Sequence, residues 1–550
     1  MRSPEALALL VGLGVALRLW AYAGNASFWL DEILLARNIV GLPLGELVTR
    51  PLRLDQVAPR GFLLVEKLAA LGLGGSELAL RLFPFLCAVA GVFLFRRLAE
   101  RALEGVAVPF ALALFALGIP LIKQAAEVKQ YALDVTGAIL LTLLALDLVA
   151  RDRSAARLLA AGLAGFAMSW FSQASVLVMG GIGLALAARW CLRRDRRTGR
   201  VLLLVVPLWA AGSAIAVWVG LRTMTPATQE FMHDFWRPGF APLPLASAAT
   251  LRWLWDEARS AFADPTLLRY PWPGLFVGVG LLGFADLCRR RRDVALLLAG
   301  PVVVALVAAA AQQYPFRGRL MGYLIPGLLL SVAAGADAIR RGIGRLQPAA
   351  GAPAMLLLLA PPVAALAGAP PPYDIEHHRT MLGYLARHRQ PGDVVCVFPV
   401  IRIGVLHYGP RFGLGPGDWV TAVCDRNDTR AYLRDVDRFR GLPRVWVLSS
   451  APRPFRVARP AVRRYLSAIG IRRDSLVRRS LQFESVSLEL YDLSDPVRLR
   501  AATAETFPVP PMPTDPRPGC RPWARPSPLD SLGSRWPPGL TAPALGPRTR

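Results

Sequence analysis

Long apolar stretches separated by short polar loops dominate the first 370 residues of this 550-residue chain. Most of these stretches are about 17 to 20 residues long, the length that a helix needs to cross a hydrocarbon layer of about 30 Å. They lie at 5–23, 78–95, 106–122, 131–149, 157–170, 173–188, 201–221, 271–288, 294–311, 320–337 and 353–369. This pattern predicts a polytopic α-helical membrane protein with about eleven transmembrane helices.

Arginine residues are distributed unevenly over the loops between these stretches. Eighteen arginines fall in five short loops, at 96–105, 150–156, 189–200, 289–293 and 338–352. Two loops between them hold only four Lys and Arg residues together, at 123–130 and 312–319. Because basic loops stay in the cytoplasm, we expect the N-terminus and the arginine-rich loops to be cytoplasmic and the other loops extracytoplasmic. Topology thus accounts for much of the net charge of +26, and a nucleic-acid partner is not indicated.

The composition divides the chain into three regions. Residues 1–370 are the predicted transmembrane domain. Residues 371–496 alternate short apolar runs with arginine-rich helical patterns, which predicts a small extracytoplasmic α/β domain. Residues 497–550 are rich in proline without apolar periodicity, so we expect a disordered tail. In the α/β domain, strands are expected at 394–398, 419–424, 445–448 and 486–491, and helices at 428–440 and 459–469.

Cys396 and Cys424 both fall in the predicted extracytoplasmic domain. An oxidising compartment would permit a disulfide between them, and two unpaired thiols are equally compatible with the sequence.

An acidic pair, Asp31-Glu32, follows directly on the first apolar stretch, in the motif FWLDEILLAR. Acidic residues in the first turn of a helix complement the helix dipole, so helix capping is one explanation. The other is a general base at the lipid–water interface, where partial desolvation and a neighbouring carboxylate raise the proton affinity of an acid. The pair alone does not decide between them.

Lysine is rare in this chain and is confined to one kind of loop. Only Lys67, Lys123 and Lys129 occur among 64 basic residues, and all three fall in or beside the first two extracytoplasmic loops. A compositional bias toward arginine explains the scarcity, but the positions of the remaining lysines indicate a need for a compact ammonium group there. The first loop also carries Gln56 and Glu66.

A polar stripe leads from the second loop into the next apolar stretch. Its members recur at spacings of three and four residues: Glu127, Gln130, Tyr131 and Asp134. Asp134 would lie just inside the membrane edge, where a carboxylate requires a partner, and Lys129, Lys123 and Arg81 are the candidates. A solvated turn is the alternative explanation of this loop.

Arg317 and Arg319 precede a late apolar stretch in the run YPFRGRL. Either arginine can be an interfacial anchor. Gly318 between them and the preceding Tyr-Pro instead predict a shaped turn that could clamp a phosphate at headgroup level.

Taken in order, the runs FWLDE, DQVAPRGFLLVEK, SELALRLFPFL, EVKQYALD and YPFRGRL resemble the bacterial GT-C glycosyltransferases. The protein-mannosyltransferase-like group, glycosyltransferase family 39, is the most similar, over about residues 5–340. The resemblance implies an integral membrane hexosyltransferase in the bacterial inner (plasma) membrane, with a polyprenyl-phosphate-sugar donor, inverting transfer and an extracytoplasmic active site.

The resemblance also implies roles for individual residues. Asp31 and Glu32 correspond to the acidic catalytic pair, with Asp31 as the favoured general base. The residues expected to bind substrate are Gln56, Glu66, Lys67, Arg81, Glu127, Lys129, Gln130, Tyr131, Asp134, Arg317 and Arg319. Some relatives use a divalent metal, so a divalent metal cofactor is possible here, but no His–carboxylate site stands out in these loops and we assign no metal ligand.

Two questions stay open at this level. The acceptor could be a protein hydroxyl, as in protein glycosylation, another glycan of the cell envelope, or a lipid. A non-catalytic transporter or scaffold for lipid-linked sugars is the alternative to an enzyme, although the absence of a Gly-rich phosphate loop argues against ATP-driven transport.

Overall fold

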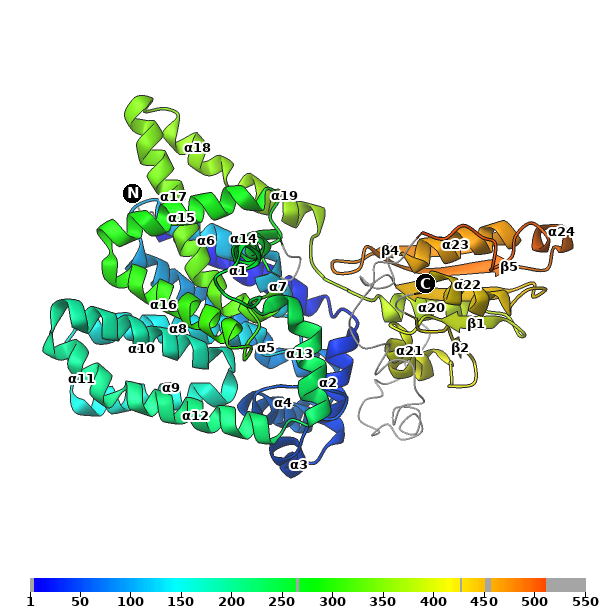
Figure 1. Ribbon diagram of the computed structural model, residues 1–550, viewed down its shortest axis with the longest axis horizontal. Coiled ribbons are helices and arrows are strands. Elements are labelled where there is room, and N and C mark those ends of the chain that lie inside the picture. Colours follow the sequence, from blue (N-terminus) through cyan, green and yellow to red (C-terminus); the bar gives the residue numbers. More distant parts are fainter. Residues whose placement is uncertain (1–3, 264–266, 426–427, 451–456, 511–550) are drawn as a thin grey trace. The chain divides into compact units, whose positions relative to one another are not determined.

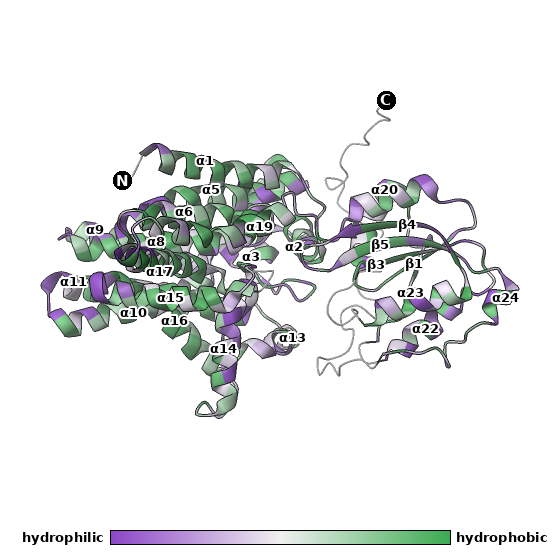
Figure 2. Ribbon diagram, turned by 90° about the horizontal axis from the view of Figure 1, so that it is seen from above, coloured by the Kyte–Doolittle hydropathy of each residue, from purple (hydrophilic) through white to green (hydrophobic). Residues whose placement is uncertain are grey.

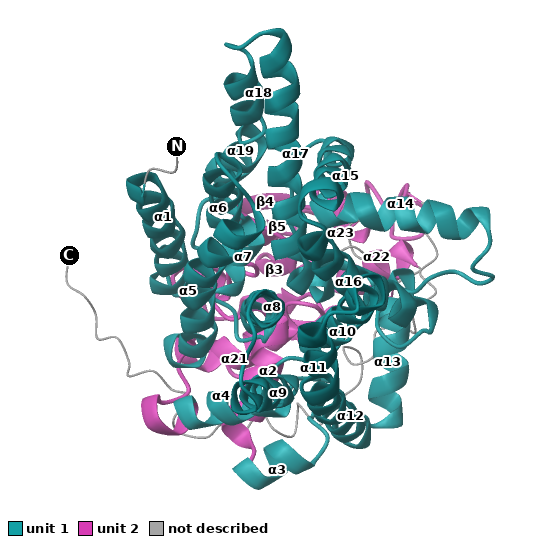
Figure 3. Cartoon of the chain, turned by 90° about the vertical axis from the view of Figure 1, so that its left-hand side faces the viewer, with its two compact units in different colours: residues 1–25, 43–69, 78–372 teal, residues 26–42, 70–77, 373–550 magenta. Residues whose placement is uncertain are grey.

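The computed structural model describes residues 4–263, 267–425, 428–450 and 457–510 (Figure 1). The chain divides into two compact units, which Figure 3 shows in different colours. The first, here called the transmembrane unit, comprises 1–25, 43–69 and 78–372. The second, here called the mixed unit, comprises 26–42, 70–77 and 373–550. The segment that carries Asp31-Glu32 therefore groups with the C-terminal region and not with the helices around it in the sequence.

Within the described residues, eight helical segments are long and apolar enough to cross a membrane. They are α1 (Pro4–Ala23), α5 (Glu77–Ala102), α8 (Tyr131–Ala150), α10 (Ala174–Arg193), α11 with α12 (Arg196–Arg222), α16 (Arg292–Ala310), η2 with α17 (Gly318–Leu346) and α18 with α19 (Gly351–Gly368). Each coincides with one of the apolar stretches of the sequence. The polytopic α-helical fold is confirmed, and the chain is a multi-pass membrane protein.

The other three predicted spans are helical but do not meet the same criteria. Gly118 interrupts the stretch 106–122, so that α6 (Ala107–Leu117) and the short α7 (Ile119–Gln124) replace one continuous helix. α9 (Ala155–Phe171) has 17 residues and ends at the polar segment around Ser172. α15 (Pro273–Arg290) has 18 residues and finishes in a charged last turn. The expected number of eleven full-length spans is thus reduced to eight among the described residues.

Shorter helices complete the transmembrane unit between these segments. They are α3 (Leu44–Thr49), α4 (Arg60–Leu73, up to residue 69), α13 (Pro226–Trp236), η1 (Arg237–Gly239) and α14 (Ala248–Ala263). The first predicted extracytoplasmic loop thus contains α3 and α4, together with α2 (Leu30–Gly41) of the mixed unit.

Small residues allow the long helices of the transmembrane unit to pack closely. A Cβ atom on Gly181 of α10 would lie 2.1 Å from the backbone nitrogen of Pro301 in α16. One on Gly283 of α15 would lie 1.8 Å from the carbonyl oxygen of Ser331 in α17. In membranes, helix association depends on this close backbone approach, because lipid offers no hydrophobic driving force between helices. Figure 2 shows that these helices are predominantly apolar along their length.

The mixed unit contains a five-stranded sheet in the order β2-β1-β3-β5-β4. The strands are β1 (Val394–Val397), β2 (Val420–Thr421), β3 (Val445–Ser450), β4 (Ile471–Arg479) and β5 (Ser485–Asp492). β1 pairs in parallel with β2 and β3, whereas β5 runs antiparallel to β3 and β4. The helices are α20 (His378–His388), α21 (Arg402–Tyr408), η3 (Gly409–Phe412), α22 (Thr429–Asp437), α23 (Ala458–Ile469) and α24 (Pro496–Leu499). The predicted small α/β fold is confirmed.

The C-terminal boundary and the cysteines differ from expectation. The expected disordered tail begins at 497, but Ala504 is 5% exposed and the ring of Phe507 packs against Tyr465. The rest of the predicted tail, 511–550, lies outside the described residues. Cys396 is a free thiol buried in strand β1, between β2 and β3, whereas Cys424 is disulfide-bonded, so the two do not pair with each other. Burial raises the pKa of the Cys396 thiol to about 12.

Candidate functional site

The acidic pair lies in the first turn of α2, within the mixed unit. The Glu32 carboxylate is 2% exposed and accepts a hydrogen bond from the backbone N–H of Trp29 at 3.3 Å. Glu32 therefore caps its own helix, as one of the two sequence explanations requires. Asp31 is half-buried. The two acids are thus not equivalent, since Glu32 is buried and caps the start of the helix, whereas Asp31 is half-buried.

Three side chains from the C-terminal region hold the segment that enters α2. The Asp374 carboxylate accepts hydrogen bonds from the backbone N–H and the hydroxyl of Ser27, at 3.2 and 2.9 Å. The Tyr408 hydroxyl accepts from the N–H of Phe28 at 2.8 Å, and the Glu376 carboxylate accepts from the N–H of Leu30 at 2.9 Å. Helix N-termini leave N–H groups without intrahelical partners, and here distant residues supply the acceptors. The C-terminal region thereby fixes the start of the helix that carries Asp31.

A buried polar cluster occupies one end of the transmembrane unit, at the turn between α7 and α8. The Lys123 ammonium donates to the Glu127 carboxylate at 2.8 Å, and the Lys129 ammonium donates to the Gln56 side-chain oxygen at 2.9 Å. Lysine is rarely buried, yet Lys67, Lys123 and Lys129 are 7%, 9% and 6% exposed. All three lysines of the chain are therefore buried, and compositional bias toward arginine does not account for that.

Asp134 is buried at the start of α8. Its carboxylate accepts a hydrogen bond from the Ser172 hydroxyl at 2.5 Å, so the expected lysine or arginine partner is replaced by the polar break between α9 and α10. Tyr314 lies near this carboxylate. Burial raises the pKa of Tyr314 above its ordinary value, and the nearby Tyr323, Asp134 and Tyr131 raise it further. The polar stripe that leads into α8 is thus buried inside the protein. The alternative explanation of this loop, a solvated turn, is wrong.

Arg319 lies in the 3-10 turn η2, which packs against α8. Its guanidinium carbon is 5.6 Å from the ring centre of Tyr131 and 5.8 Å from that of Trp236 in α13, both within the range of cation–π attraction. The two rings therefore flank the guanidinium group. Arg317 differs, because it pairs with the buried carboxylate of Glu257 at 2.8 Å.

Three more of the expected binding residues are buried in the transmembrane unit. Arg81 in α5 is 1% exposed, and Gln130, directly before α8, is 6% exposed. Glu66 in α4 is completely buried, and neither of its carboxylate oxygens has a hydrogen-bond partner among the described residues. Burial raises the pKa of Glu66 well above its ordinary value and lowers that of the adjacent Lys67. A buried acid without a partner is costly and marks a position of functional interest.

No metal centre is formed by the residues of the described ranges. Within them, no three histidine, cysteine or carboxylate side chains gather closely enough to hold an ion. No chemical step below depends on a metal ion.

Several members of these clusters were not identified from sequence. They are Ser172, Trp236, Glu257, Glu376 and Tyr408, none of which belongs to a recognisable motif. For Ser172 the sequence does carry a signal, the polar run Ser169–Gln173 between two apolar stretches.

Comparisons with known proteins find solved structures that are similar to this chain only at low sequence identity and low TM-score. No family model and no curated protein matches the chain. The chain is similar to the oligosaccharyltransferase of Archaeoglobus fulgidus in complex with Zn and sulfate, at 14% identity and a TM-score of 0.44, covering 72% of this chain and 60% of that one. It is similar to the oligosaccharyltransferase AglB of the same organism with an inhibitory peptide and a dolichol-phosphate, at 10% identity and a TM-score of 0.43, covering 85% and 72%.

A third similar structure is ArnT from Cupriavidus metallidurans bound to undecaprenyl phosphate, at 14% identity and a TM-score of 0.41, covering 88% of this chain and 97% of that one. The chain spans less than two thirds of the first oligosaccharyltransferase. Similarity at this level does not establish a shared fold, so function has to be argued from the residues themselves.

Proposed function

We propose that the protein is an integral membrane glycosyltransferase of GT-C type that moves a sugar from a polyprenyl-phosphate donor to an acceptor hydroxyl. The observation that carries the proposal is the burial of all three lysines of the chain, two of which are hydrogen-bonded to Gln56 and Glu127 at one end of the transmembrane unit. Buried ammonium groups among carboxylates and amides suit a ligand that combines a phosphate with sugar hydroxyls. The ordered motifs of the sequence point to the same class of enzyme.

The proposed reaction is an inverting displacement at the anomeric carbon. Asp31 takes the proton of the acceptor hydroxyl, whose oxygen forms the new bond to the sugar as the bond to the phosphate oxygen breaks. The transition state has oxocarbenium character, which nearby carboxylates stabilise. The leaving polyprenyl phosphate gains negative charge, and Arg319 and Lys129 are assigned to hold it. Glu66 with Lys67, and Asp134 with Gln130, are assigned to the sugar and phosphate oxygens.

The proposal is tested by comparing a strain that lacks the gene with its parent, and by assaying the purified full-length protein. We expect one glycosylated envelope product to disappear, and the purified protein to release polyprenyl phosphate from a labelled polyprenyl-phosphate hexose when envelope extract supplies the acceptor. A donor that crosses a vesicle membrane intact, with no release of polyprenyl phosphate, would show a transporter instead.

The proposed orientation places the arginine-rich loops in the cytoplasm of a bacterial cell and the lysine-containing loops outside. Cys191 and Cys288 are exposed thiols at the arginine-rich ends of α10 and α15, which makes them reporters of sidedness. We expect a membrane-impermeant maleimide to label wild type and a Cys191→Ser/Cys288→Ser variant equally in intact spheroplasts. After permeabilisation, wild type should take up more label than the variant. A difference already present in intact spheroplasts would reverse the orientation.

A further inference from the structure

An arginine-lined cleft of about 500 Å³ lies at the opposite end of α8 from the buried lysine cluster. The 20 residues of α8 separate the two ends by about 30 Å. The last turns of α5, α8, α10 and α15 and the first turn of α16 surround it. Its arginines are Arg101, Arg151, Arg193, Arg290, Arg291 and Arg292.

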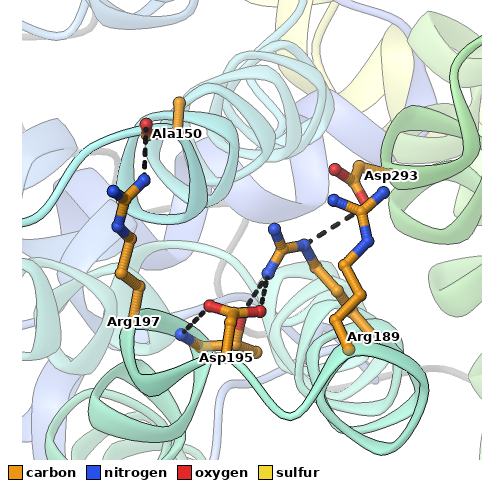
Figure 4. A network of polar contacts seen from close by, with 7 residues as sticks. Ala150, Arg189, Asp195, Arg197 and Asp293 are labelled. Carbon is orange, nitrogen blue, oxygen red and sulfur yellow. Dashed lines mark hydrogen bonds and ion pairs between the residues drawn. The ribbon is translucent and has the colours of Figure 1, made fainter.

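The arginines of the cleft exceed the acids available to them. Two aspartates line the same cleft, and both are already engaged: Asp147 pairs with Arg153 at 2.6 Å, and Asp293 pairs with Arg189 at 3.2 Å and with Arg193 at 3.3 Å. Figure 4 shows how Arg189 bridges Asp293 and Asp195 beside the cleft. The ion pairs of the two aspartates therefore hold side chains at the wall of the cleft in place. The remaining arginines leave the cleft with a net positive charge.

Three of the arginines retain donors for an incoming anion. Arg151 and Arg292 have no ion-pair partner among the described residues, and both are exposed. The Nε atom of Arg291 is buried without a hydrogen-bond partner within the same residues, although its guanidinium reaches Glu104 at 3.2 Å. Guanidinium groups that converge on one cleft match the oxygens of a phosphate, which accepts two parallel N–H bonds from each arginine.

The surroundings favour a phosphate that belongs to a lipid. Large apolar side chains are exposed on the helices that form the cleft, with Leu192 at 76%, Leu281 at 64% and Val307 at 61%. Such surfaces on membrane-spanning helices face acyl chains. Leu192 is adjacent to Arg193, so the charged cleft and the lipid-facing surface are continuous.

We propose that this cleft binds the phosphate headgroup of an anionic phospholipid from the leaflet at the arginine-rich end of the bundle. Basic pockets between the ends of transmembrane helices have the chemistry for such headgroups, and each arginine near the surface contributes about 1 kcal/mol, or about fivefold in affinity. Headgroup binding would join the ends of five helices through one ligand. The inference does not depend on the proposed glycosyltransferase activity.

The test measures phospholipid binding to the purified full-length protein by native mass spectrometry. Phosphatidylglycerol and phosphatidylcholine are the anionic and neutral probes, and inorganic phosphate is the competitor. Wild type should bind phosphatidylglycerol in preference to phosphatidylcholine. An Arg151→Ala/Arg292→Ala variant should bind phosphatidylglycerol about 25-fold more weakly than wild type does. The matched control is Arg196→Ala/Arg345→Ala, which removes two exposed arginines from the predicted arginine-rich loops outside the cleft and should bind as wild type does.

Two results would overturn the proposal. Equal weakening in both double variants would show that only diffuse surface charge attracts the lipid. Displacement of phosphatidylglycerol by millimolar inorganic phosphate, with no preference for the lipid, would show a site for the free anion. All four substituted arginines are exposed, and unchanged thermal unfolding would exclude misfolding as the cause.

Discussion

Asp31→Asn is expected to lower the rate of sugar transfer from a polyprenyl-phosphate donor by about 10² to 10⁴-fold, the usual contribution of a positioned general base. Asparagine keeps the size and polarity of the side chain but cannot take the proton of the acceptor hydroxyl. Because Asp31 is half-buried in the first turn of α2, the protein should remain folded and inserted. The measurement is the release of polyprenyl phosphate by the purified variant under single-turnover conditions.

Two further variants separate catalysis from helix capping. Glu32→Gln retains an oxygen that can accept the N–H of Trp29, so it should cost far less activity than Asp31→Asn. Glu46→Gln removes a half-buried acid from α3 that lies 4.0 Å from Arg50, and it is the matched control with unchanged transfer. Near-normal transfer by Asp31→Asn, or a greater loss in Glu32→Gln, would contradict the assignment of Asp31 as the base.

The arrangement around α2 also changes how the C-terminal region should be tested. The sequence predicts a small α/β domain there and assigns it no role. Hydrogen bonds from Phe28 to Tyr408 and from Leu30 to Glu376 make it part of the support of α2. Deleting the region would remove these acceptors from the start of α2, so loss of activity after deletion would not by itself indicate acceptor binding.

Most of the fold was predictable, because transmembrane helices are specified by the length and apolarity of a continuous segment. The errors have local causes. Gly118 adopts an extended conformation that ends α6 early, which hydropathy does not register. Strand β4 was missed because four of its nine residues are arginines and most of its side chains are exposed at the edge of the sheet, so it lacks the apolar run expected of a strand.

The residues of the candidate site could be predicted from the sequence, but their hydrogen-bond partners could not. The lysine pattern and the helical spacing identified Lys129 and Asp134 within short segments. Their hydrogen-bond partners lie 73 and 38 residues away along the chain, in Gln56 and Ser172, and only the packing of separate helices brings them together. The same applies to Trp236 beside Arg319. A single sequence carries no signal for such pairings, because each residue is unremarkable in its own segment.

Arg319→Ala is expected to reduce transfer by about 10² to 10³-fold, the cost of removing one preorganised donor to a developing negative charge. Tyr131 and Trp236 already hold the guanidinium at 5.6 and 5.8 Å, so little reorganisation is needed when the phosphate leaves. Arg319→Lys keeps the charge but loses the planar fork of donors, and an intermediate rate is expected. Single-turnover rates at saturating donor measure the effect on the chemical step.

The matched control is Arg222→Ala. Arg222 is exposed at the end of α12 and its guanidinium carbon lies 5.3 Å from the ring of Trp218, so the substitution removes the same kind of cation–π contact without touching the buried cluster. Its transfer rate should equal that of wild type. If both variants lost activity equally, the loss would come from a weakened aromatic contact at the membrane surface. If neither did, the donor phosphate would have to be held elsewhere, and the buried lysines Lys123 and Lys129 would be the next groups to replace.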